Sequence, residues 1–413
     1  MRPMDLPKNA PAIVVGAGPA GLMAAEILAK ASKRVIVFDQ AASPARKFLL
    51  AGRGGLNLTH SDPPDRFLAR YGAAAGRLQE AIEAFPPEAL RRWCGELGEP
   101  TFVGASGRVF PKSFKSSPLL RTWLKSLAAL GVELRPRHRL MNFDEAGDPV
   151  FEAPQGRLIQ QAGAVILACG GASWPRLGSD GAWVEILRAR DIEVALLQPA
   201  NCGFGVEWSA PFKARFLGAP LKSIALRFGQ AQMRGEAVVT VAGLEGGAVY
   251  GLAAPLREAI NRDGEARLEF DLKPDVSLEA LTRRLERPRG AQSLATFLRK
   301  AVGLTPLAIA LLREAGAPPS DARALAQAIK HASLRLTSVA PIARAISSAG
   351  GVAWSELDDN FMLRRMPGIF AAGEMIDWEA PTGGYLLQAC FATGAAAARG
   401  AVKWLESRAE PGT

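Results

Sequence analysis

Short apolar runs followed by helical patterns organise the beginning of the chain. The run 13–15 leads into a glycine-rich loop, and residues 22–30 then repeat their apolar positions with helical spacing. A second β-rich run, 35–38, ends on Asp39. The pattern predicts a strand–loop–helix–strand unit over residues 13–39.

Two later apolar runs have the same character. Residues 164–168 form a continuous apolar run that ends at Gly170 and Gly171, and residues 369–372 end at Gly373 and Glu374. Continuous runs of this kind are typical of inner strands of a parallel sheet. A helix rich in small residues, 389–406, follows the second run. The two ends of the chain are therefore expected to share one domain.

The middle of the chain has a different pattern. Strand-like composition over 222–228 and 237–241 is followed by a period-two alternation over 266–271, and from there to residue 331 the pattern is helical with breaks at prolines. We predict an α/β fold: a Rossmann-type domain over 1–195 and 336–413, an inserted β-rich, barrel-like module over 196–275, and a small helical module over 276–335. Within the first domain, two helices are expected over 77–98 and a β-hairpin over 101–110.

The loop GAGPAG is the strongest chemical signal. Gly16 allows a tight turn after the strand, Gly18 lets a pyrophosphate approach the backbone, and Gly21 lets helix and strand pack closely. Pro19 suits the first helical turn, and the free N–H groups there attract phosphate. Asp39 follows the glycines by about 20 residues, where a carboxylate binds a ribose hydroxyl. The alternative is a unit of this shape that binds nothing.

A second glycine-rich stretch, 45–60, is expected to lie against a ligand. Three glycines occur within four residues, and Lys47, Arg53, Asn57 and Thr59 add charge and hydrogen-bonding groups. The alternative is a flexible surface loop. Four leucines flank the glycines, whereas solvated loops are rarely so apolar.

Composition limits the class of protein. The chain has 413 residues and a net charge of +10, and it contains neither the ~20 consecutive apolar residues of a membrane helix nor a signal-peptide pattern. Its four cysteines and three histidines lack metal-ligand spacing. We therefore predict a reduced cytoplasmic protein without a metal or a membrane segment. Cys169 is expected to pack against a neighbouring strand rather than to do redox chemistry.

The excess of basic residues has two interpretations. Basic groups cluster at 108–115, 135–139, 283–289 and 299–300, but no RNA-binding signature accompanies them. Solvated basic faces explain such clusters, and so does contact with a phosphate-rich partner.

Three segments together, GAGPAG with Asp39, ILACGG and GIFAAGEMID, resemble the FAD-binding scaffold of the two-dinucleotide-binding-domain flavoproteins. Four further segments resemble its BaiN/YhiN-like (RdsA-like) family: AGRGGLNLTHS, GRVFPKSFKSS, ASWPRLGSDG and PTGGYLLQACFATG. This resemblance implies FAD lying extended across the Rossmann-type domain, with the inserted part covering the flavin end. Leu56 stands where the family has cysteine, and Leu386 stands where it has asparagine, so the chain belongs to a variant branch.

The resemblance implies a cofactor site and an activity, but it names no catalytic residue. The residues expected to contact FAD are Gly16, Gly18, Pro19, Ala20, Gly21, Asp39, Gln40, Lys47, Gly52, Gly54, Asn57, Gly170, Gly171, Gly373, Glu374, Thr382, Gly383, Gly384, Tyr385 and Leu386. The implied function is an FAD oxidoreductase that NAD(P)H reduces and that passes hydride to a C=C bond in a small molecule. The alternatives are reduction of uridine in ribosomal RNA and a flavin-bound assembly protein without turnover. If the basic charge serves RNA, we expect the flavin entrance to be bordered by Arg108, Lys112, Lys115, Arg283, Arg284 and Arg287.

Overall fold

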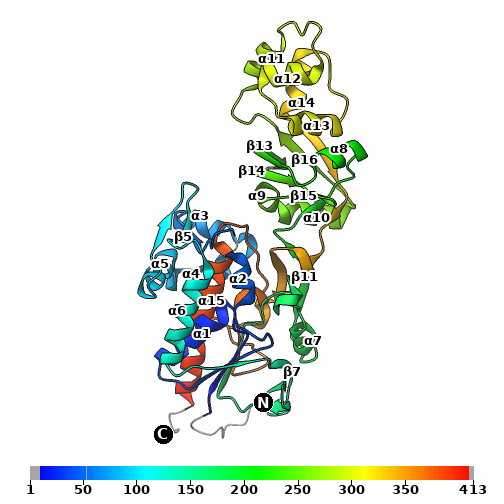
Figure 1. The fold of residues 1–413 in the computed structure, drawn as a ribbon. Coiled ribbons are helices and arrows are strands. Elements are labelled where there is room, and N and C mark those ends of the chain that lie inside the picture. Colours follow the sequence, from blue (N-terminus) through cyan, green and yellow to red (C-terminus); the bar gives the residue numbers. More distant parts are fainter. Residues whose placement is uncertain (1–9, 53, 409–413) are drawn as a thin grey trace. The chain divides into compact units, whose positions relative to one another are not determined.

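The computed structural model describes residues 10–52 and 54–408, and their backbone divides into two compact units (Figure 1). The first unit contains residues up to 198 and from 347 onward, and the second contains residues 199–346. Arg53, which the sequence places in the second glycine-rich stretch, lies outside the described residues. Each unit has its own apolar core.

A parallel five-stranded sheet forms the centre of the first unit. Its strand order is β20-β10-β1-β2-β6, and every neighbouring pair is parallel. The strands are β1 (Ala12–Val15), β2 (Val35–Asp39), β6 (Glu133–Pro136), β10 (Ala164–Leu167) and β20 (Ile369–Ala371). Ile13 pairs with Val165, which in turn pairs with Ile369. The prediction that the apolar runs at the two ends of the chain share one parallel sheet is confirmed.

Two helices with small side chains pack closely beside this sheet. They are α1 (Pro19–Lys30) and α15 (Tyr385–Ser407), which run side by side in Figure 1. A Cβ at Gly394 would overlap the carbonyl oxygen of Ala20, so glycine is required where the helices approach. The hydroxyl of Thr393 accepts a 3.0 Å bond from Gly373 N. The end of β20 is therefore fixed to α15.

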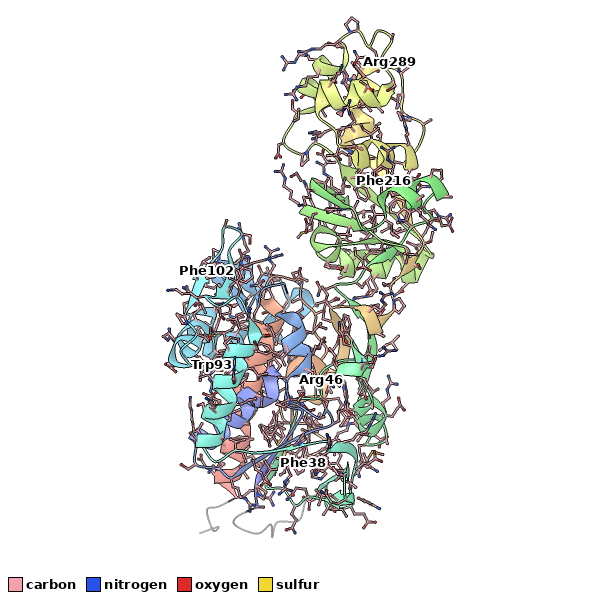
Figure 2. All side chains as sticks on the ribbon, viewed as in Figure 1. Phe38, Arg46, Trp93, Phe102, Phe216 and Arg289 are labelled. Atoms are coloured by element: carbon pink, nitrogen blue, oxygen red, sulfur yellow. The ribbon has the colours of Figure 1, made fainter. Side chains whose placement is uncertain are left out.

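A buried carboxylate joins α1 to two neighbouring helices, α5 (Pro87–Glu96) and α6 (Ser116–Ala129). Glu26 is 2% exposed and accepts bonds from the indole N–H groups of Trp93 and Trp123, the latter at 2.7 Å. Lys30 Nζ lies 2.6 Å from the same carboxylate. Trp93 is labelled in Figure 2. A buried anion is stable when donors surround it, so this cluster is part of the core.

The remaining elements of the first unit are short. Its helices and 3₁₀ turns are α2 (Arg46–Ala51), α3 (Pro64–Ala69), η1 (Gly72–Ala74), α4 (Ala75–Ala84), η2 (Pro175–Leu177), α7 (Trp183–Arg188), η4 (Trp354–Glu356) and η5 (Gly373–Met375). Its small sheets contain β3 (Thr59–His60), β4 (Thr101–Val103) and β5 (Arg108–Pro111), and β7 (Arg139–Phe143), β8 (Pro149–Ala153) and β9 (Gly156–Ile159). The hairpin β4–β5 and the helix pair α4–α5 confirm the predictions for 101–110 and 77–98.

The second unit is built on a seven-stranded sheet of order β17-β16-β13-β14-β15-β12-β18. Its strands are β12 (Phe204–Gly205), β13 (Pro220–Phe228), β14 (Ala231–Val239), β15 (Gly243–Glu245), β16 (Ala266–Asp271), β17 (Ala332–Leu336) and β18 (Ser338–Val339). The two edge strands, β17 and β18, are separated in sequence only by Thr337, so the sheet curls until its edges adjoin. The barrel-like character expected for the insertion follows from this topology.

The helices of the second unit occur both before and after β16 in the sequence. They are α8 (Ala210–Phe216), α9 (Gly247–Tyr250), α10 (Ala253–Asp263), α11 (Leu278–Leu285), α12 (Leu294–Val302), α13 (Pro306–Glu314) and α14 (Ala322–Lys330), with η3 (Ile342–Arg344) near the end. Side chains of Ser277, Ser293, Thr305 and Asp321 cap the last four α-helices. Whether the insertion comprises two modules, as the sequence suggested, stays an interpretation.

The second unit leaves and rejoins the first through neighbouring strands. β11 (Val194–Ala200) and β19 (Ser347–Val352) form a two-stranded sheet, and Ile346 N donates a 3.3 Å bond to Asn201 O. The two ends of the insertion therefore meet at one point of the chain.

Candidate functional site: a nucleotide pocket in the first unit

The glycines of the first loop have two distinct structural roles. Gly16 has a φ of +104°, and a Cβ there would overlap Ala168 O. A Cβ at Gly21 would overlap Gly16 O, so these two glycines shape the loop itself. A Cβ at Gly18, by contrast, would meet no atom within 4 Å among the described residues. Gly18 thus leaves free space at the N-terminus of α1, where a phosphate binds most readily.

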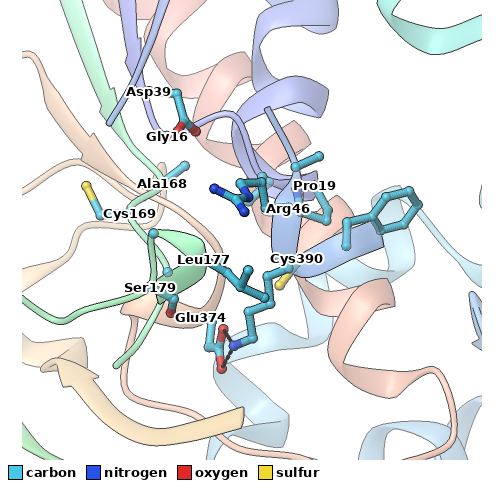
Figure 3. Close-up of a pocket in the computed structure, with 18 of the residues that line it drawn as sticks. Gly16, Pro19, Asp39, Arg46, Ala168, Cys169, Leu177, Ser179, Glu374 and Cys390 are labelled. Atoms are coloured by element: carbon cyan, nitrogen blue, oxygen red, sulfur yellow. Dashed lines mark hydrogen bonds and ion pairs between the residues drawn. The ribbon is translucent and has the colours of Figure 1, made fainter. Parts of the chain in front are cut away.

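A pocket that is partly open to solvent lies at this helix terminus (Figure 3). It extends from the carboxyl ends of β1, β2 and β10 to η5, as ligand sites of open α/β sheets do. Nine of the residues expected to contact a cofactor line it: Gly16, Gly18, Pro19, Ala20, Asp39, Lys47, Gly170, Gly373 and Glu374. The pocket is therefore assembled from segments that lie far apart in sequence.

Asp39 already has hydrogen-bond partners on the protein. Its carboxylate accepts 2.7 Å bonds from the backbone N–H groups of Ala17 and Ala41. Burial raises the pKa of Asp39, and these two bonds partly oppose the shift. The next residue, Gln40, lines the adjoining grooves and donates a 2.8 Å bond to Gly178 O. Asp39 thus holds the glycine loop against the end of β2.

An ion pair between Lys47 and Glu374 lies at the other end of the pocket. Lys47 Nζ is 2.7 Å from Glu374 Oε2 and 2.6 Å from Ser173 Oγ. Glu374 Oε1 also accepts a 2.8 Å bond from Ser348 N, at the start of β19. Gly171 packs so tightly here that a Cβ would overlap Ser348 Oγ. This network links the pocket wall to the strand that returns from the second unit.

Two polar residues in the pocket were not expected from the sequence. Arg46 begins α2 and extends into the pocket in Figure 3, beside the N-terminus of α1. Ser179 Oγ is buried and has no hydrogen-bond partner among residues 10–52 and 54–408. An orphaned buried hydroxyl is costly unless a ligand satisfies it. The motif ASWPRLGSDG contained the signal for Ser179, but its sequence did not indicate which side chain faces the pocket.

Both cysteines that line the pocket carry neutral thiols. Burial raises the pKa of Cys169 to about 12, and it raises the pKa of Cys390 to about 12 as well. Cys169 Sγ lies 3.8 Å from Val15 O, against the neighbouring strand. A protonated thiol is a poor nucleophile, so neither cysteine has the character of a redox centre.

A second group of expected cofactor residues lies outside the lining of this pocket. Gly384 (φ +97°) packs directly against the backbone of Thr59, and Asn57 Nδ2 donates a 2.8 Å bond to Thr59 O. Gly52 packs against Ser116, and Gly54 is exposed. Gly52, residues 54–59 and the N-terminus of α15 therefore form a separate cluster, which also contains the half-buried Thr382 and Leu386 and the buried Gly383.

Tyr385 fixes the N-terminus of α15 in this cluster. Its hydroxyl donates a 2.7 Å bond to Asp62 Oδ2, and its carbonyl accepts a 2.8 Å bond from Tyr71. The ring stacks on His60 with centroids 5.2 Å apart. Burial raises the pKa of Tyr385, so the phenol stays protonated at neutral pH. The side chain anchors the helix and is almost fully buried.

Within residues 10–52 and 54–408, no group of three or more His, Cys, Asp or Glu side chains could hold a metal ion. No helix in the same part of the chain is long and apolar enough to cross a membrane.

A parallel sheet with GAGPAG at its first turn and an acid at the end of β2 defines a dinucleotide-binding fold. Together with the family and relatives given next, it makes the protein a flavoprotein of the FAD-dependent oxidoreductase class. The family model of the HI0933-like protein Rossmann domain matches residues 10–400, and the chain belongs to this family. The family resemblance noted in the sequence is confirmed.

Two curated relatives match almost the full chain. The 3-dehydro-bile acid delta(4,6)-reductase of Clostridium scindens is 24% identical over 94% of this chain and 98% of its own length. The ribosomal RNA dihydrouridine synthase of Escherichia coli is 23% identical over 91% of this chain and 94% of its own.

Solved structures with the same fold include a flavocytochrome c3 fumarate reductase, with a TM-score of 0.53 at 16% identity over 96% of this chain and 78% of that one. Another is the 3-ketosteroid-delta4-(5alpha)-dehydrogenase of Rhodococcus jostii RHA1, with a TM-score of 0.50 at 17% identity over 97% of both chains. At these identities the likeness concerns the fold.

Proposed function

We propose that the protein is an FAD-dependent reductase of a C=C bond in a small, largely apolar molecule, with NAD(P)H as its reductant. The observation that carries the proposal is the pocket at the N-terminus of α1, combined with the bile acid reductase among the relatives. Hydride transfer between NAD(P)H, FAD and substrate is the chemistry that the cofactor supplies when bound. The free thiols are compatible with a reducing compartment, and we propose a cytoplasmic location.

The residues of the pocket suit the phosphates and riboses of FAD. The open space at Gly18 and the helix terminus beside it favour the pyrophosphate, with the Arg46 guanidinium close by. Asp39 would exchange a backbone donor for a ribose hydroxyl. Ser179 would gain the hydrogen-bond partner that it lacks among the described residues. These groups support the proposal that the pyrophosphate and the adenosine ribose lie in this pocket.

Lys47 and Glu374 are proposed to hold the part of the cofactor nearest the flavin. Lys47 Nζ and the Ser348 N–H group both donate to the Glu374 carboxylate and fix its orientation. Its carboxylate is therefore positioned to accept a bond from a ribityl hydroxyl without turning. The second group, which consists of Gly52, Gly54, Asn57 and residues 382–386, is proposed to surround the isoalloxazine end.

The test begins with the purified protein. We expect a yellow protein that releases one FAD per chain on denaturation, identified by mass, and whose bound flavin bleaches on anaerobic addition of NADPH or NADH. Reoxidation by a 4-ene-3-ketosteroid but not by its saturated analogue supports the C=C reductase. A colourless protein that FAD does not stabilise contradicts the cofactor, and reduced flavin that no enone reoxidises contradicts the substrate class.

A second candidate function is the reduction of uridine in ribosomal RNA. The observations in its favour are the dihydrouridine synthase among the relatives and the net charge of +10. We expect the reduced protein to convert uridine in protein-free ribosomal RNA to dihydrouridine, detected as a mass gain of two hydrogens per site. Flavin that NADPH reduces but that neither RNA nor enone reoxidises would leave the assembly protein as the remaining alternative.

A further inference from the structure

We propose that a surface of the first unit, here called the aromatic–basic patch, binds a single-stranded RNA segment. The patch consists of Phe102, Phe110, Phe114, Arg108, Lys112 and Lys115, which lie on β4, on β5 and in the turn after β5. The inference rests on the second candidate function but concerns binding, which is measured separately from reduction.

The aromatic part of the patch is a surface cluster. Phe102 lies 5.0 Å from Phe114 and 5.9 Å from Phe110, measured between ring centroids, and Phe110 and Phe114 are 5.4 Å apart. Phe114 is 49% exposed, and its φ of +58° is rare for a residue with a large side chain. Phe102 is labelled in Figure 2. An exposed ring on a strained backbone adds little to the stability of the fold, whereas it offers a ligand a flat face on which to stack.

The three cations of the patch have no anionic partner among the described residues. Arg108, Lys112 and Lys115 are exposed, and none of them forms an ion pair or side-chain hydrogen bond among the described residues. They alternate in sequence with Phe110 and Phe114. Cations interleaved with exposed aromatic rings are what single-stranded nucleic acid requires, because phosphates need charge and unpaired bases need flat apolar faces. A neutral steroid would use the rings but not the three cations.

The patch is in contact with the second glycine-rich stretch. Leu56 N donates a 2.9 Å bond to Phe114 O, and a Cβ at Gly55 would lie 3.3 Å from the ring of Phe114. Thr59, at the end of this stretch, in turn packs against Gly384 at the N-terminus of α15. An RNA strand on the patch would therefore lie beside the cluster proposed to surround the flavin ring.

The charge is tested with the FAD-loaded protein and a fluorescent oligouridylate of about twelve nucleotides. In a plot of log binding constant against log salt concentration, each contact between a cation and a phosphate of a single strand contributes a slope of about −0.7. With three such contacts, a tenfold decrease in salt concentration strengthens RNA binding about 100-fold. Lys112→Gln with Lys115→Gln should reduce that gain to about fivefold. Arg121→Gln with Lys125→Gln, which removes the same charge from the exposed face of α6, should leave the slope unchanged.

The rings are tested with Phe114→Gly, which suits a positive φ and removes the exposed side chain. We expect RNA affinity to fall about tenfold at every salt concentration, with thermal stability equal or higher. Trp174→Gly is the matched control, because Trp174 is also exposed and also has a positive φ of +62°. The proposal is overturned if the two control variants lose as much RNA affinity as the two patch variants. It is also overturned if the Lys112 and Lys115 substitutions leave the salt dependence of RNA binding unchanged. Flavin content and bleaching by NADPH, recorded on each variant, report the cofactor separately.

Discussion

Gly18→Val separates cofactor binding from folding, because Gly18 is the glycine of the loop that faces open space. A Cβ at this position meets no described atom within 4 Å, and the residue has an extended backbone with φ −82° and ψ −177°. Valine therefore fits the protein without FAD, and its restricted unfolded chain favours folding slightly. In the FAD complex the same side chain would occupy the space of the pyrophosphate.

The expected loss of affinity follows from the bonds displaced. Hydrogen bonds to a charged group contribute about 1.5–3 kcal/mol each, so losing two backbone N–H bonds to phosphate weakens FAD binding by at least about 100-fold. At an FAD concentration 100 times the wild-type dissociation constant, binding stabilises the wild type by about 2.7 kcal/mol. A stabilisation of that size corresponds to roughly 3 °C in melting temperature for a protein of 413 residues.

The assay is thermal unfolding of FAD-free protein with and without added FAD. Gly18→Val should melt at or above the wild-type temperature without FAD, and added FAD should raise its melting temperature by less than about 1 °C. Gly21→Ala should instead melt lower in both conditions, because its Cβ would overlap Gly16 O. A wild-type FAD shift in Gly18→Val would refute the proposed position of the phosphates. Gly54→Val, also free of neighbours within 4 Å, then tests whether the second glycine-rich stretch touches the cofactor.

Three further predictions concern other parts of the first unit. Glu26→Ala leaves the indole N–H groups of Trp93 and Trp123 without their acceptor and should cost about 2–5 kcal/mol in urea unfolding, with FAD affinity retained in the folded protein; an unchanged unfolding midpoint would contradict this role. Because the pKa of Asp39 is raised in the folded state, the native protein binds more protons than the unfolded chain in this pH range. The stability of the FAD-free protein should therefore fall as pH rises from about 3.8 through the folded pKa. Asp39→Asn should flatten that part of the pH profile, and a profile that the substitution leaves unaltered would contradict the prediction. With pKa values near 12, Cys94, Cys169 and Cys390 should stay unmodified by iodoacetamide at pH 8 for hours in folded protein, as peptide mass spectrometry would show, whereas rapid labelling of any of them would disprove the burial described.

The sequence was most informative for elements that a local pattern of residues determines by itself. The unit 13–39, the runs 164–168 and 369–372, and the hairpin 101–110 are all set by local periodicity and by glycine, and each is present. Strands such as β12 and β18 have only two residues, and such short stretches carry no period to detect. Their pairing depends on contacts across the sheet.

The candidate site was predictable to the extent that backbone geometry determines it. The roles of Gly16 and Gly21 follow from the turn itself, whereas the pairing of Lys47 with Glu374 joins residues 327 positions apart and has no local signal. Arg46 was missed for a similar reason, since an arginine at the start of a short helix is ordinarily a surface residue. Tyr385 was expected beside the cofactor, but nothing in its sequence indicated the hydrogen bond to Asp62 that buries it.

The backbone hydrogen bond between Asn201 and Ile346 brings the two ends of the insertion together, so the insertion is a separable module. Because the insertion begins and ends on adjacent backbone positions, β11 and β19 are arranged like the two arms of a hairpin whose turn has grown to about 145 residues. Loop closure costs rise only slowly with length, so an exchange of one insertion for another leaves the nucleotide domain almost unaffected thermodynamically. A lineage with this plan can recruit a new substrate by replacing the insertion as a block, while the glycine loop, Asp39 and the Lys47–Glu374 pair pass on unchanged.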